Sequence, residues 1–221
     1  MHIEPGIVTG AKLALSYATA AGAGLYAARE ALTAIRERGI GSLLARSAIS
    51  TAGVFTFFQI LPHFPVGVSE VHFILGSTLF LLFGAAPAAI GLAMGLLLQG
   101  LFFAPFDLPQ FGMNVTTLLV PLFAVQALAR RIIAPHTPYV DLRYGQALAL
   151  STAYQGGVVV WVAFWAIYGQ GLAGIGGIAT FGAAYMMVVL IEPLVDLAVL
   201  AGAKSLHGLR RSGLVTPRLF A

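Results

Sequence analysis

The sequence predicts an all-α, polytopic membrane protein, in which about seven transmembrane helices form a single integral-membrane domain over residues 1–221. Three observations support this fold class. Hydrophobic residues make up 59% of the chain and charged residues only 9%, whereas a soluble domain carries roughly 25% charged residues. Long apolar stretches recur along the chain. The basic residues fall in the short segments between these stretches, which argues against a nucleic-acid partner despite the net charge of +4.

The expected spans follow from hydropathy. A helix needs about 20 apolar residues to cross the hydrocarbon core of a bilayer. Candidate spans cover residues 7–28, 47–62, 71–84, 85–104, 113–129, 146–168 and 174–203. The first is expected to remain in the mature protein, because acidic Glu4 rather than a basic segment precedes it.

The third and fourth spans are expected to form one buried hairpin over residues 71–104, joined by a tight turn at Gly84 to Pro87. The loop of residues 29–46 carries mixed charge and has room for a short interfacial helix. The sequence shows no convincing internal repeat, which disfavours a secondary transporter built from inverted repeats.

Basic residues predict the orientation. Cytoplasmic loops of membrane proteins carry an excess of Lys and Arg. Seven spans with an external N-terminus place nearly all basic residues on the cytoplasmic side, with Lys12 as the exception. They follow the first, fifth and seventh spans: Arg29, Arg36, Arg38, Arg46, Arg130, Arg131, Arg143, Lys204, Arg210, Arg211 and Arg218. The tail of residues 204–221 is therefore expected in the cytoplasm, and the protein in the cell (inner or plasma) membrane.

The same topology gathers other polar residues at the external ends of the spans. These are His2, Glu4, His63, Glu70, His72, Asp107 and Asn114. His136 and His207 fall on the cytoplasmic side. Histidines and acids around an external N-terminus suggest a site that captures a cation from outside.

The external N-terminal segment, residues 1–6, can chelate a metal. The amine of Met1, and the amide and imidazole nitrogens of His2, can wrap a divalent cation in fused rings. A fourth nitrogen would complete a square plane, a geometry typical of Ni(II) or Cu(II). The chain has no cysteine, so thiolate ligands are excluded.

His72 is a candidate for that fourth nitrogen. It lies at the mouth of the third span, on the side of His2, and the alternative is an interfacial histidine that hydrogen-bonds water. The Pro5-Gly6 pair can turn the first residues back toward the bundle, and Gly67 permits a tight loop opposite.

Several segments, in order, resemble the substrate-capture membrane subunit of cobalt/nickel energy-coupling-factor (ECF) transporters, the CbiM/NikM family. They are Met1-His2-Ile3, Pro65 to His72, Phe83 to Ile90, Gln99 to Phe103 and Gly112 to Val115. The resemblance covers roughly residues 1–120, and the later residues agree mainly in hydrophobic pattern. Only His72 lies in a family-like segment, which favours it over His63 at the external end of the second span.

The resemblance implies metal ligands at Met1, His2 and His72, with Asn114, Ser69 and Glu70 supporting them. It implies a transported Co(II) or Ni(II) ion, no catalytic cofactor and no enzymatic activity of the chain itself. It also implies a transmembrane coupling subunit, cytoplasmic ATPase subunits and a small accessory membrane subunit as partners.

Two departures from the family pattern affect the metal preference. The usual Asp-Gly-Gly turn is replaced by Ala104 to Pro109, and Glu70 stands where the family has a small or neutral residue. The sequence does not separate cobalt from nickel, because both accept nitrogen ligands.

Other features have more than one interpretation. Glu192 and Asp196 lie on one face of the seventh span and fit either an ion relay or structural pairing, and pairing is favoured. Small residues recur every four positions in the first span and allow close helix packing, either within the bundle or against a coupling subunit.

An alternative function is capture of a vitamin or another organic ligand, for which Trp161, Trp165 and Tyr168 would line a pocket. An intramembrane enzyme is disfavoured, because no paired catalytic motif lies within the spans. The glycine-rich stretch from Gly171 to Gly177 has no Lys-Ser/Thr and is not expected to bind ATP.

Overall fold

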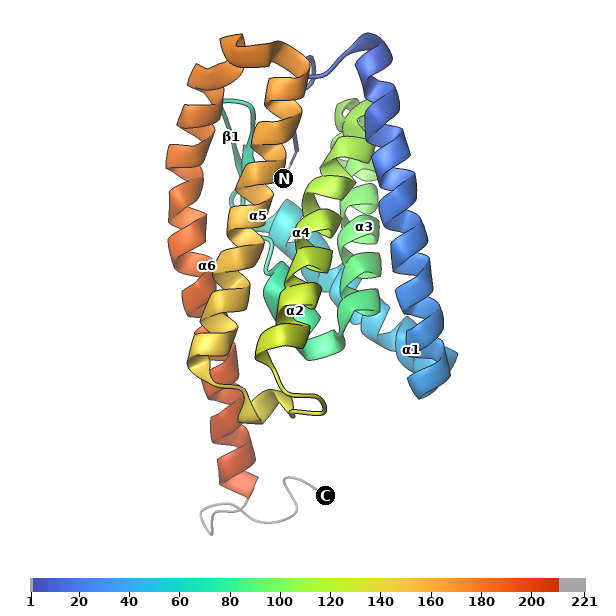
Figure 1. The fold of residues 1–221 in the computed structure, drawn as a ribbon, viewed down its shortest axis with the longest axis vertical. Coiled ribbons are helices and arrows are strands. Elements are labelled where there is room, and N and C mark those ends of the chain that lie inside the picture. Colours follow the sequence, from blue (N-terminus) through green and yellow to red (C-terminus); the bar gives the residue numbers. More distant parts are fainter. Residues whose placement is uncertain (1, 211–221) are drawn as a thin grey trace.

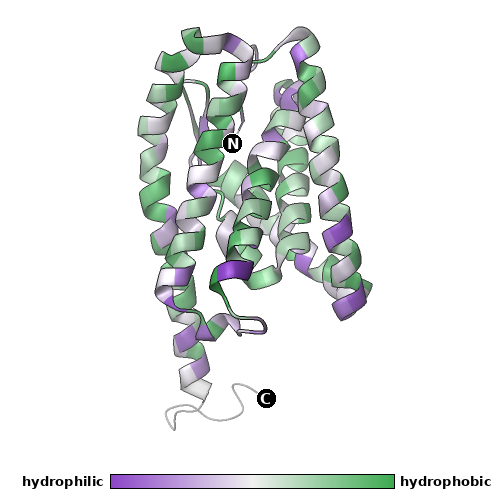
Figure 2. Cartoon of the chain, viewed as in Figure 1, coloured by the Kyte–Doolittle hydropathy of each residue, from purple (hydrophilic) through white to green (hydrophobic). Residues whose placement is uncertain are grey.

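A computed structural model describes residues 2–210 of the chain, with side chains described to residue 208. Met1 and residues 211–221 lie outside the described part, so the predicted Met1 ligand and the basic residues Arg211 and Arg218 are not placed. The described residues form a bundle of long helices with one small β-hairpin near its upper end (Figure 1). Figure 2 shows hydrophobic residues along most of the helices and hydrophilic ones concentrated at their lower ends.

The first helical element, α1 (Leu13–Phe55), follows a short 3-10 turn, η1 (Gly10–Lys12), and contains the first two predicted spans. Gly39, with φ of 79° and ψ of 160°, breaks it into two legs that descend and return in Figure 1. A non-glycine residue would be strained at this φ, so the glycine provides the turn. The predicted loop at residues 29–46 is therefore helical except at Gly39. The second leg ends in a π-helical turn, η2 (Thr56–Ile60).

The β-hairpin was not predicted. Strands β1 (Phe64–Val66) and β2 (Ser69–Val71) pair antiparallel, with Pro65 opposite Glu70. Gly67, at φ of 65°, makes the turn between the strands. A Cβ at this glycine would lie 2.2 Å from the carbonyl oxygen of Gly177, so the turn also packs closely against the last helix.

The third predicted span, residues 71–84, is only partly helical. Helix α2 (Gly76–Phe83) has eight residues, about 12 Å at 1.5 Å per residue, and cannot cross a hydrocarbon core of about 30 Å. Residues 72–75, just before it, belong to no helix or strand, and Leu75 adopts a left-handed conformation. Gly84, at φ of 91°, makes the predicted tight turn into α3 (Ala85–Phe102).

The second half of the chain continues through η3 (Pro105–Gln110), α4 (Phe111–Ile132), η4 (Tyr139–Asp141), α5 (Tyr144–Gln170), η5 (Gly171–Gly174) and α6 (Ile175–Arg210). The predicted seventh span ends at residue 203, whereas α6 continues through the start of the predicted tail. Helix α1 packs against α3 and α4, and α5 packs against α4 and α6.

Four continuous helical stretches within residues 2–210 are long and apolar enough to cross a membrane. They are Gly10–Ile60, Ala85–Phe102, Pro105–Ile132 and Tyr144–Gly208. The first contains both legs of α1, and the last contains α5 and α6. The count of seven crossings and their direction stay predictions.

Two apolar clusters determine the position of the functional site. The main cluster, which includes Phe58, Leu118, Tyr154 and Tyr185, fills the centre of the bundle. A smaller cluster consists of Ile3, Val8, Met113 and Trp165, and fixes the N-terminal segment against α4 and α5. Complete burial of an Ile side chain contributes about 1.5–3 kcal/mol, so Ile3 anchors the residue beside it.

Candidate metal site

The N-terminal segment adds to the edge of the hairpin. Ile3 forms an antiparallel bridge with Ser69. The amide of Glu70 donates to the carbonyl of His2 at 2.9 Å, and the amide of Glu4 donates to the carbonyl of Val68 at 3.1 Å. The predicted return of the first residues to the bundle is confirmed, with Gly6 at φ of 93° just after them.

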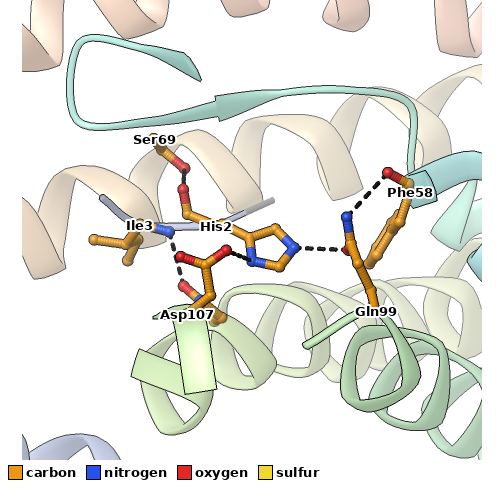
Figure 3. Close-up of polar contacts among 7 residues, drawn as sticks. His2, Ile3, Phe58, Ser69, Gln99 and Asp107 are labelled. Carbon is orange, nitrogen blue, oxygen red and sulfur yellow. Dashed lines mark hydrogen bonds and ion pairs between the residues drawn. The ribbon is translucent and has the colours of Figure 1, made fainter. Parts of the chain in front are cut away.

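Side chains complete the attachment of this segment. Ser69 Oγ donates to the carbonyl of His2 at 2.8 Å, and Asn114 Oδ1 accepts from the amide of Ile3 at 2.8 Å (Figure 3). The three residues predicted to support the site, Ser69, Glu70 and Asn114, therefore all contact the main chain of residues 2 and 3.

The imidazole of His2 is 3% exposed and contacts two residues that sequence reasoning did not assign to the site. Its Nε2 lies 2.7 Å from Oε1 of Gln99, at the end of α3, and its Nδ1 lies 2.8 Å from Oδ2 of Asp107, in η3 (Figure 3). Gln99 Nε2 donates to the carbonyl of Phe58 at 3.1 Å. This bond turns Oε1 of Gln99 toward His2, so Nε2 of His2 is the donor, while Nδ1 faces the carboxyl group of Asp107.

His72 lies beside His2, between β2 and α2. The two ring centroids are 6.4 Å apart with the planes inclined at 61°, and the ring of Phe58 packs 4.4 Å from that of His72. His72 is 2% exposed, and its Nδ1 donates to the carbonyl of Phe73 at 3.0 Å. Its Nε2 is buried without a hydrogen-bond partner among the described residues.

His63 has a different environment. It is half-buried, and its Nδ1 lies 3.1 Å from the carbonyl of Leu61. In the structure the ring of His72 lies beside that of His2.

Three carboxyl groups give the surroundings of His2 a negative character. Burial raises the pKa of Glu4, and the nearby carboxylates of Glu70 and Asp107 raise it further, with His2 opposing. One carboxyl oxygen of Glu70 is buried without a partner among the described residues. A cation entering this region would relieve the repulsion between these carboxylates.

The space beside His2 is a small crevice lined by Leu96, Gly100, Asp107 and Asn114, among others. A much larger cleft of about 630 Å³ is lined instead by basic and acidic residues that include Glu30, Arg38, Arg46, Arg130 and His136.

The aromatic residues considered for an organic ligand belong to the core around the N-terminal segment. Trp165 is fully buried and packs with Ile3, Val8 and Met113. Trp161 Nε1 donates to Thr116 Oγ1 at 3.1 Å.

Comparison with known proteins agrees with this architecture. Crystal structures described as a transition metal transporter and a truncated transition metal transporter match with TM-scores of 0.68 and 0.64, each at 18% identity. The matches cover 97% and 96% of this chain, and 96% and 99% of the other chains, respectively. At this identity they establish a shared fold. Among proteins with curated descriptions, none matches the chain.

The family comparison is more specific. A family described as the cobalt uptake substrate-specific transmembrane region, CbiM, matches residues 2–208. That range includes the candidate site and nearly all of the described helices. The protein is therefore a multi-pass membrane protein that serves transport rather than catalysis, and the chain belongs to the CbiM cobalt uptake family.

Proposed function

We propose that this chain is the substrate-capture component of an energy-coupling-factor transporter that imports Co(II) or Ni(II). The metal would bind between the first two residues and His72. The observation that carries the proposal is Nε2 of His72, which is buried beside the ring of His2 and has no hydrogen-bond partner among the described residues.

The environment of His72 is that of a metal ligand. Buried polar atoms in proteins are nearly always hydrogen-bonded, so an unpaired imidazole nitrogen needs an explanation. Metal-bound histidines commonly donate their other N–H to a carbonyl, which fixes the ring and leaves the second nitrogen to the metal. The bond from His72 to the carbonyl of Phe73 has this form.

Main-chain nitrogens are proposed to complete the site. The described His, Asp and Glu side chains of residues 2–210 form no group of three or more suited to hold a metal. The two imidazoles would therefore be joined by the amide of His2 and the amine of Met1, as the family resemblance implies. A metal–imidazole bond is about 2.0–2.1 Å. An ion held by Nε2 of His72 and Nδ1 of His2 would therefore have to replace the contact between Nδ1 of His2 and Asp107.

The wider assembly is part of the same proposal. A capture component has no ATPase of its own, so it would act with a transmembrane coupling subunit, cytoplasmic ATPase subunits and a small accessory membrane subunit. Seven crossings with an external N-terminus would expose the metal site to the outside. The gathering of arginines around the 630 Å³ cleft is compatible with a cytoplasmic surface at that end.

The test is calorimetric titration of the purified, detergent-solubilised protein with Ni(II) and Co(II). A stoichiometry of one ion per chain is expected, with affinity that falls as the pH is lowered because the ligand nitrogens must lose protons. The variant His2→Ala/His72→Ala serves as the control and should lose the high-affinity site. Equal binding by the control, or none by the native chain, would exclude the proposed site.

A further inference from the structure

Two buried carboxyl groups on α6 contact the beginning of α2. Glu192 is fully buried and Asp196 is 2% exposed. Asp196 accepts hydrogen bonds from the hydroxyls of Ser77, at 2.6 Å, and Thr78, both in the first turn of α2. Of the two interpretations of this pair from the sequence, the contacts favour structural pairing over an ion relay.

Glu192 binds the main chain just before α2. Its Oε1 accepts from the amide of Ile74, and its Oε2 accepts from the amide of Leu75 at 2.9 Å. Gln155 Nε2 also donates to Oε2, and the hydroxyl of Tyr185 donates to Oε1 of Gln155 at 2.6 Å. The carboxyl group is thus held in place by α5 and α6 together.

The carboxyl groups provide hydrogen-bond acceptors at the start of the short helix α2. The amide of Leu75, the residue that precedes α2, has no partner within the helix, and the first residues of α2 are buried. A carboxylate is also favoured near the positive end of the helix dipole.

A single peptide unit links Glu192 to His72. The carbonyl of Phe73 accepts from His72 Nδ1, and the N–H of the same peptide, which belongs to Ile74, donates to Glu192. Because a peptide unit is planar, the carboxyl group that fixes its N–H also fixes the direction of its C=O. We infer that Glu192 is a positioning residue that orients the imidazole of His72 for the metal.

The inference rests on the proposed function, because it assumes that His72 binds the metal. It predicts that Glu192 affects metal affinity only through His72. The substitution Glu192→Gln replaces one carboxyl oxygen by an NH₂ group, which cannot accept from a main-chain amide. The side chain then has one oxygen for the amides of Ile74 and Leu75, so the two-point hold on the segment after His72 is lost. Loss of such a supporting contact typically lowers metal affinity about 10- to 100-fold.

The experiment is a double-mutant cycle on the full-length protein in detergent, with Ni(II) as the probe. Four proteins are titrated: native, Glu192→Gln, His72→Ala and the double variant. In the native background we expect the loss of about 10- to 100-fold. In the His72→Ala background, where only the N-terminal nitrogens bind at higher Ni(II) concentration, Glu192→Gln should change affinity less than about twofold. Equal losses in both backgrounds would mean that Glu192 has only a general structural role and would overturn the inference.

Two further measurements keep the test decisive. Asp196→Asn is the matched control. It also alters a buried carboxyl contact between α6 and α2, but this contact involves the hydroxyls of Ser77 and Thr78 and not the main chain beside His72. Asp196→Asn should therefore retain native Ni(II) affinity. If Glu192→Gln does not fold, Gln155→Leu removes a donor that holds Glu192, and the cycle is repeated with it. The Ni(II) spectrum of either variant should shift toward that of His72→Ala, and an unchanged native spectrum would contradict the inference. Absence of Ni(II) binding by the native chain would instead exclude the proposed function itself.

Discussion

The imidazole rings of His2 and His72 lie with their centroids 6.4 Å apart, one from the first residues and the other from the segment that precedes α2. The hairpin brings them together, since β2 binds the main chain of His2 and leads directly into His72. Phe58 packs against one ring, and its carbonyl holds the glutamine that contacts the other. Five predictions follow from this arrangement and from the proposed metal site.

An N-terminal extension should weaken metal binding. Adding Gly-Ser before Met1 converts the proposed amine ligand into an amide and crowds a buried segment. Calorimetric titration with Ni(II) should show at least about a tenfold loss, the scale on which metal sites respond to altered surroundings. The same dipeptide at the C-terminus is the control. Native affinity in the N-terminally extended protein would remove Met1 from the ligand set.

The two external histidines should respond differently. His72→Ala removes a buried nitrogen that has no partner among the described residues and should abolish tight Ni(II) binding. His63→Ala should leave binding intact, because the ring of His63 hydrogen-bonds the nearby carbonyl of Leu61 instead. Equilibrium dialysis of the two variants measures the difference. The reverse result would transfer the ligand role to His63.

Gln99 should affect Ni(II) affinity although it is not a proposed ligand. Gln99→Leu removes the acceptor for His2 Nε2 and leaves the carbonyl of Phe58 without its donor. The imidazole then keeps only its contact with Asp107 and is oriented less firmly, so Ni(II) affinity should fall about 10- to 100-fold. Gln110→Leu, on the neighbouring η3, is a matched control for loss of a buried amide, and the two affinities should differ clearly.

Ile3 should support metal binding through packing alone. Ile3→Ala removes buried methyl groups from the cluster with Val8, Met113 and Trp165, a change that typically lowers stability by about 2–5 kcal/mol. The N-terminal segment should detach in part, which lowers Ni(II) affinity while the bundle stays folded. Thermal unfolding followed by circular dichroism, with Ni(II) titration in parallel, separates the two effects. Unchanged affinity would show that the hairpin alone holds His2.

The bound metal should report its ligands by its spectrum. Amine, amide and imidazole nitrogens in fused rings enforce a near-planar geometry, so the Ni(II) complex should be yellow and diamagnetic. Cu(II) should bind at least as tightly as Ni(II), since it stands higher in the order of divalent-metal affinities. Optical spectra and magnetic susceptibility provide the measurement. A paramagnetic, octahedral Ni(II) centre would exclude the amide ligand and favour His2, His72 and carboxylates such as Glu70.

The sequence predicted the long helices well because burial in lipid requires long apolar runs, which are visible residue by residue. It predicted the turn at Gly84 for a similar reason, since Gly-Ala-Ala-Pro marks a break. It did not predict that α2 is only eight residues long, because Phe73, Ile74 and Leu75 are as apolar as a helical span, yet Glu192 binds the amides of Ile74 and Leu75 before the helix begins. A contact between residues so far apart in the chain leaves no local pattern.

The candidate site was predicted in part. The sequence predicted that His2 and His72 belong to one site, and their rings are neighbours. The residues predicted to support them contact the main chain of residues 2 and 3: Ser69, Glu70 and Asn114. Gln99 was quoted only as part of a family-like segment, and Asp107 was placed among the external polar residues but not assigned to the site. Their position at the ring of His2 depends on how α3 ends and η3 begins, which hydropathy does not specify.

The hydrogen bond from Ile74 to Glu192 joins residues 118 positions apart in the chain. During synthesis, the segment that carries His72 leaves the ribosome long before the helix that holds it. An incomplete chain that lacks α6 would therefore have both histidines but would leave the amides of Ile74 and Leu75 without their acceptor. With Glu192 orienting His72 as inferred, full metal affinity would be reached only once the last helix has been inserted, so that unfinished chains would hold the ion less tightly.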